Sequence, residues 1–118
     1  MVGSTLLLGM WPTDALAQEA APRHWIQAVV EGSMDGHVAR QAGIALRVRK
    51  DVLEARFDPI SRNMLLTVLG SSDLDKAKID DLLAPLDLFV RCLQRKVVDD
   101  TPVQLLDPGT CQDATMNK

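Results

Sequence analysis

The stretch that decides the predicted fold is SDLDKAKIDDLLAPLDLFVRCLQRKV, residues 72–97. At about 100° per residue, eight of its apolar side chains fall within one arc of roughly 120°, which is typical of a helix packed on a core. Those side chains are Ile79, Leu82, Leu83, Leu86, Phe89, Val90, Leu93 and Val97. Ser72 is typical of a helix start, and Pro85 predicts a kink because it removes a backbone hydrogen bond. The pattern therefore predicts one long, Pro-kinked helix over about residues 73–97.

Residues 52–69 predict a β-hairpin that packs on this helix. Apolar and charged residues alternate over 53–58, turn-forming residues occupy 58–63, and 64–69 is a continuous apolar run. Residues 24–31 fit a strand slightly better than a helix. Residues 37–48 favour a helix at their start, and their second half fits either a helix or an added strand. We expect a small α+β domain.

The order strand, helix, hairpin, helix resembles part of a ferredoxin-like unit. The chain lacks a metal-binding loop of that kind, so this resemblance implies no function.

Composition restricts the function classes. With 118 residues, 47% apolar and 25% charged, the chain is long enough for one folded domain and too short for two. An aromatic share of 3% argues against stacking platforms, and a net charge of −3 argues against nucleic-acid binding. The basic residues between Arg40 and Arg62 are interspersed with acids, which is typical of a solvated face.

The N-terminal segment resembles the end of an export signal. The apolar run includes Leu6-Leu7-Leu8, and Ala15-Leu16-Ala17 predicts cleavage before Gln18. No Lys or Arg precedes the run, so the basic n-region is missing. The alternative is an apolar arm that packs on the domain or on a neighbour. We expect a signal peptide at 1–17, a linker at 18–22, one domain at 23–111 and a disordered tail at 112–118.

Cys92 and Cys111 are the two cysteines of the chain. In an exported protein a bridge between them would tie the C-terminal segment to the body of the domain and stabilise it by about 3 kcal/mol. In a reducing compartment they would be two unrelated thiols. Redox catalysis is not indicated, because the chain has no Cys-x-x-Cys pair.

Metal binding and catalysis have little support in the sequence. His24, Met34 and His37 are weak candidates for a metal site, because copper proteins use such ligands but the spacing matches no known signature. The acidic residues at 73–81 do not match a calcium loop and suit a helix start. The sequence contains no nucleophile-elbow, P-loop or dinucleotide motif, so we expect no cofactor and no enzymatic activity.

Three leucines lie outside the predicted core stripe and are candidates for an interface. They are Leu88, Leu105 and Leu106. The predicted strand at 64–69 is apolar on both of its faces. Together with it, the three leucines predict more apolar surface than one helix can cover.

Three hypotheses for function follow. The first is a small exported accessory protein, such as a non-catalytic subunit of a larger periplasmic or membrane-associated complex. The second is a periplasmic binding or carrier module for a metal or small ligand. The third is a small enzyme of unrecognised type. We favour the first, with a periplasmic or secreted location and either a protein partner or a second copy. Contact with a membrane would be through the partner complex, because no stretch after the N-terminal segment reaches about 18 consecutive apolar residues.

Overall fold

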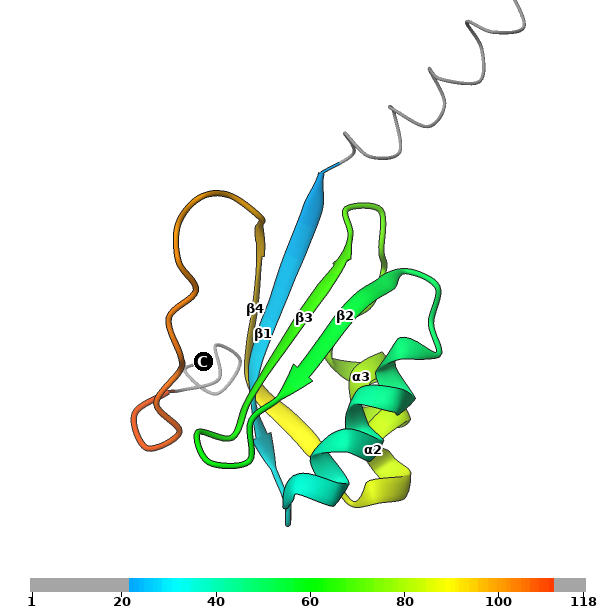
Figure 1. The fold of residues 1–118 in the computed structure, drawn as a ribbon, viewed down its shortest axis with the longest axis vertical. Helices are drawn as coiled ribbons and strands as arrows, with labels where there is room; N and C mark the ends of the chain where they lie inside the picture. The colour runs from blue at the N-terminus through cyan, green and yellow to red at the C-terminus, as the bar shows by residue number, and fades with distance from the viewer. Residues whose placement is uncertain (1–21, 112–118) are drawn as a thin grey trace, which may run out of the picture.

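A computed structural model describes residues 22–111 as a four-stranded antiparallel sheet with two helices on one face (Figure 1). The elements are β1 (Arg23–Glu31), α2 (Gly36–Arg47), β2 (Val52–Phe57), β3 (Asn63–Leu69), α3 (Lys76–Leu83), the 3-10 turn η1 (Ala84–Leu86) and β4 (Phe89–Val97). The strands lie in the order β2-β3-β1-β4. The predicted α+β class is therefore confirmed for a small single domain. The predicted signal peptide, most of the linker and the tail fall outside the described residues.

The N-terminal half contains the elements that its patterns favoured. Residues 24–31 form a strand, and 52–69 form an antiparallel hairpin. Residues 37–48, whose second half fitted either a helix or a strand, form a helix up to Arg47. Asp35 caps α2, because its carboxylate accepts the backbone N–H of Val38 at 2.8 Å.

The prediction of a long helix over 73–97 is wrong. The α-helix ends at Leu83, and a 3-10 turn containing Pro85 follows it. Asp87 then adopts a φ of 57°, in the left-handed region that ends helices. The remaining residues pair with β1 as β4. The helix also begins later than predicted, because Asp75 rather than Ser72 provides the cap, accepting from the backbone N–H of Lys78 at 2.9 Å.

Apolar residues in the two halves of this stretch are buried for different reasons. Ile79 and Leu83 are four residues apart and face the sheet from α3, whereas Leu88 and Val90 are two residues apart and alternate as in a strand. Phe89, predicted to be in the helix stripe, is half-exposed. The helical spacings of α3 and the alternating spacing of β4 together happen to fit a single helical arc. The apolar pattern therefore predicted one long helix where the structure has a short helix and a strand.

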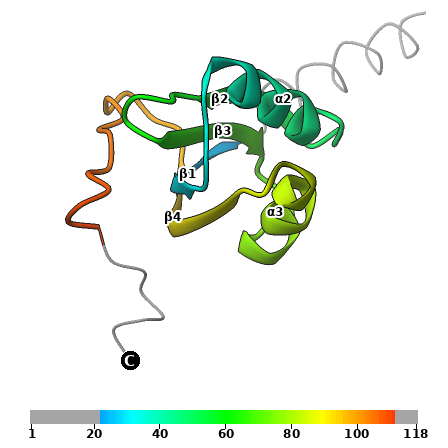
Figure 2. The ribbon, with the colours of Figure 1, turned by 90° about the horizontal axis from the view of Figure 1, so that it is seen from below.

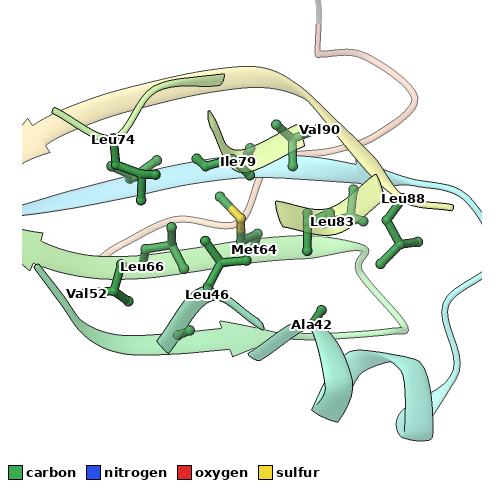
Figure 3. Packing of buried hydrophobic residues seen from close by; sticks show 14 of the residues in the cluster. Ala42, Leu46, Val52, Met64, Leu66, Leu74, Ile79, Leu83, Leu88 and Val90 are labelled. Atoms are coloured by element: carbon green, nitrogen blue, oxygen red, sulfur yellow. The ribbon is translucent and has the colours of Figure 1, made fainter. Parts of the chain in front are cut away.

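One hydrophobic core lies between the sheet and the two helices (Figure 3). It is formed by alternate residues of all four strands and by the inner faces of α2 and α3. Its fully buried large side chains include Ile26, Leu46, Met64, Leu66, Ile79 and Leu83. The helices therefore cover one face of the sheet, and the other face carries no helix.

Polar contacts fix the turns around this core. Asp51 accepts hydrogen bonds from Arg49 at 2.8 Å and from the Ser72 hydroxyl at 2.6 Å, so it joins the start of β2 to the segment before α3. The Arg49 guanidinium is the main cause that lowers the pKa of Asp51 to about 2. On the other side, the Asp80 carboxylate accepts the backbone N–H of Val90 at 2.8 Å and holds α3 against β4.

Within the described residues 22–111, no helix has the length and apolar character needed to cross a membrane.

Candidate binding site under the C-terminal strap

The face of the sheet opposite the helices is partly covered by the C-terminal segment, residues 98–111, which we call the strap. Figure 2 shows α2 and α3 on one side of the sheet and the strap on the other. The strap leaves β4 where the N–H of Val98 donates to the carbonyl of Arg23 at 2.9 Å. It then returns over β1 and β3.

Buried amide side chains of the sheet hold the strap by its backbone. Asn63 donates to the carbonyl of Leu106 and accepts from its N–H, both at 2.8 Å. Gln27 donates to the carbonyl of Gln104 at 2.7 Å. The two amides also bond to each other, at 3.2 Å. Both side chains are almost fully buried, so the strap backbone satisfies polar groups that would otherwise be costly to bury.

A disulfide between Cys92 and Cys111 fixes the far end of the strap. Their Cα atoms lie 6.1 Å apart, within the limit of about 7 Å that a bridge can span, so the predicted pairing is present. Cys92 lies where the register between β1 and β4 shifts: Gln27 pairs with Gln94 but Val29 with Arg91, which leaves one extra residue in β4. This bulge, with a φ of 59° at Cys92, positions the cysteine toward the strap.

Arg91 is a second anchor for the strap. Its guanidinium donates to the carbonyls of Pro108 at 2.6 Å and Cys111 at 3.2 Å, and it forms an ion pair with Glu31. Within a long helix, Arg91 would have been a free surface residue on the polar side. As part of β4 it joins the sheet to the strap.

Replacing Arg91 with alanine is expected to lower the free energy of unfolding by about 1–2 kcal/mol, because two strap carbonyls lose a charged donor. Arg56→Ala is the matched control, since Arg56 pairs only with Glu54 on an exposed strand face and its loss should change stability by no more than about 0.5 kcal/mol. Urea unfolding of both variants measures the difference. Equal effects would show that Arg91 does not anchor the strap.

Between the strap and the sheet lies a cavity of about 400 Å³. Its floor comes from β1 and β4, and its wall comes from strap residues 101–104. The floor residues are Trp25, Gln27, Gln94, Arg95 and Lys96. The Lys96 ammonium lies 5.2 Å from the centre of the Trp25 ring, in cation–π geometry.

The cavity has a positive lining. Lys96 contributes charge, and no carboxylate side chain belongs to the lining. Arg95 donates to neutral acceptors: His24 Nδ1 at 2.7 Å and the carbonyls of Ser72 and Gly70 at 2.9 and 3.2 Å. Arg95 pairs with Ile26 of the core face, so its guanidinium lies on the helix side of the sheet and is directed away from the cavity.

The three metal-site candidates are not brought together. His24 opens β1 and its Nδ1 lone pair accepts from Arg95. His37 is exposed in the first turn of α2, beyond the other end of the nine-residue β1, on the order of 25 Å away. Met34 packs against the hydrophobic core. Among the described residues, no group of three or more His, Cys, Asp or Glu side chains is arranged to hold a metal ion.

The three leucine candidates have different surroundings. Leu88 is 2% exposed and belongs to the core, so the expectation that it lies on an outer edge is wrong. That expectation depended on helical geometry, whereas in the structure Leu88 lies just before β4. Leu106 is half-buried on the strap, and Leu105 is 65% exposed. Of the three, Leu105 alone is well placed to contact a partner.

The sequence reasoning missed the residues that build this site. Gln27 and Trp25 lie on a predicted strand, but a single polar or aromatic residue in a strand does not indicate what covers it. Asn63 was predicted to belong to the turn before the second strand of the hairpin. One signal was available: Gln27 interrupts the apolar run at 25–30, which is unusual for a position without a hydrogen-bonding partner.

No protein-family model matches the sequence, and comparison with curated proteins found no match. Among solved structures, a chain described as "CopZ metallochaperone" matches with 18% identity, over 56% of this chain and 97% of that chain, at a TM-score of 0.49. At this identity and TM-score, the likeness carries no information about function.

Proposed function

We propose that this protein is a small exported accessory protein that binds a protein partner and does not itself catalyse a reaction. One observation carries the proposal: exposed apolar side chains occur at the end of α2 and on the edge strand β2 that follows it. Ile44 is 47% exposed, Val48 73% and Leu53 43%. We call these three residues the α2–β2 corner.

The position of the corner suits an interface. Ile44 and Val48 are four residues apart, so they lie on the same side of α2 and its C-terminal cap. Leu53 lies in β2, which is an edge strand of the sheet. Arg47 donates to the carbonyl of Ala55 at 3.4 Å, so this carbonyl is directed away from β3 and toward α2. Apolar residues beside an edge strand favour association with another chain.

The test of the interface is a pair of charge substitutions. Val48→Asp combined with Leu53→Asp should abolish association of the mature protein with a second copy or with a partner from envelope extract. Ile60→Asp is the matched control, because Ile60 is almost fully exposed in the β2–β3 turn, away from the corner. Analytical ultracentrifugation, together with co-purification at native abundance, measures both forms of association.

The result would contradict the proposal in either of two cases. The unmodified protein could sediment as a monomer and retain no partner, which would remove the accessory role. Alternatively, the double variant could associate as well as the Ile60→Asp control, which would place the interface elsewhere. A specific interface should bury at least about 1,000 Å² in total.

The Cys92–Cys111 disulfide supports the exported location, because such bonds persist in oxidising compartments. N-terminal sequencing of protein from the host envelope should begin at Gln18 or within a residue or two of it. An intact Met1 in that fraction would contradict cleavage and favour the alternative of an apolar arm. The matched comparison is protein from the cytosolic fraction, where uncleaved precursor is expected.

A further inference from the structure

The cavity under the strap has the size and the walls of a small-molecule site. Its volume of about 400 Å³ falls within the roughly 300–1,000 Å³ typical of such sites. The chain connection to β4 and the Cys92–Cys111 bridge hold the two ends of the strap. The hydrogen bond from Gln27 to Gln104 fixes the strap wall directly above the floor. The walls are therefore formed before any ligand enters.

The floor is rigid, and part of the wall is apolar. The amide of Gln27 donates to Asn63 and Gln104 and accepts from Gln94 at 3.0 Å, so both of its ends are engaged. Pro102 and Val103 of the strap face the cavity from the other side. The Trp25 ring adds an aromatic surface. These groups suit a ligand with an apolar or planar body.

Lys96 supplies a positive charge, which a ligand in this cavity would complement with a negative one. Among the described residues, no carboxylate forms an ion pair with Lys96 and no side chain accepts its hydrogen bonds. The Trp25 ring positions its ammonium but leaves its N–H donors available. The acidic residues closest to Lys96 in the sequence, Asp99 and Asp100, are exposed and do not belong to the cavity lining.

We propose that this cavity binds a small organic anion, consisting of a carboxylate, phosphate or sulfonate attached to an apolar or aromatic body. The anionic group accepts hydrogen bonds from Lys96. The body of the ligand packs between Trp25 and the strap residues Pro102 and Val103. The site uses β1, β4 and the strap, whereas the α2–β2 corner uses the opposite edge of the sheet, so it goes beyond the accessory role and does not depend on it.

The probe is 2-naphthoate, an aromatic carboxylate small enough for the cavity, with neutral 2-naphthylmethanol as its uncharged counterpart. Titration of the full chain is followed by NMR through the indole N–H of Trp25, which a Trp25→Phe variant distinguishes from that of Trp11. Saturable binding of naphthoate is expected, with naphthylmethanol binding at least tenfold more weakly. Lys96→Gln should weaken naphthoate binding by tenfold or more, because a charge-assisted hydrogen bond is lost.

Lys50→Gln is the matched control, because Lys50 is an exposed lysine in the turn between α2 and β2. It should bind naphthoate as the unmodified chain does, and so should the Val48→Asp, Leu53→Asp variant. The proposal would be overturned if naphthoate gave no saturable shift of the Trp25 signal at millimolar concentration. It would equally be overturned if the neutral compound bound as tightly, or if Lys96→Gln left the affinity unchanged while circular dichroism showed a folded protein.

Discussion

Leu83→Ala is expected to lower the free energy of unfolding by about 2–5 kcal/mol. Leu83 is fully buried between α3 and the sheet, and truncating it removes apolar contacts and leaves a cavity in the core (Figure 3). The short α3 has few other residues facing the sheet, so its attachment depends strongly on this side chain. Denaturant unfolding monitored by circular dichroism measures the loss.

Leu105→Ala is the matched control, because Leu105 is a leucine on the outside of the strap. Its removal should change stability by no more than about 0.5 kcal/mol. A similar loss from the two variants would contradict the assignment of α3 to the core face and of Leu105 to the surface.

Cys111→Ser is expected to lower the free energy of unfolding by about 3 kcal/mol. The bridge closes a loop with a sequence separation of 19, and its removal restores conformational freedom to the unfolded chain. In the folded protein the strap would then be held by Arg91 and by the backbone hydrogen bonds to Gln27 and Asn63. Hydrogen exchange at the Leu106 amide should rise, because that N–H is protected only while the strap is docked on Asn63.

Reduction provides the internal control for this variant. A reducing agent should shift the unfolding midpoint of the unmodified protein to that of Cys111→Ser and should leave the variant unchanged. If reduction had no effect on the unmodified protein, the bridge would not contribute to stability. If the variant also responded, the reagent would be acting elsewhere.

The sequence was informative where each pattern had one geometric solution. Residues 53–58 alternate, and 64–69 are continuously apolar between turn residues, so a hairpin was the consistent interpretation. The cysteine pair was also predictable, because a chain with two cysteines has one possible intrachain bridge. Near Pro85 the pattern allowed two solutions, since Leu86, Phe89, Val90 and Leu93 fit a helical arc as well as they fit the end of a turn followed by a strand.

What resolves that ambiguity is the free edge of β1. A helix continued past Pro85 would leave the backbone groups along that edge without strand partners, whereas β4 satisfies them from His24 to Glu31. This gain comes from residues 58 to 73 positions away, so no local pattern in 72–97 can indicate it. The late cap at Asp75 and the left-handed Asp87 are the local features compatible with the result.

The candidate site depended still more on tertiary structure. Trp25 and Lys96 are 71 positions apart, and they meet only because β1 pairs with β4 in antiparallel register. Gln27 and Asn63 are buried only because the strap returns over them.

By itself, the amino-acid sequence determined the α+β class, the hairpin and the identity of the only two cysteines. Those features follow from alternation, turn chemistry and residue count, which are local or compositional. The tertiary structure decided that residues 89–97 are a strand, that Leu88 is inside, and that a positively lined cavity forms under the strap. Those outcomes depend on backbone pairing and burial between distant segments, whose free energy is absent from any single stretch of the chain.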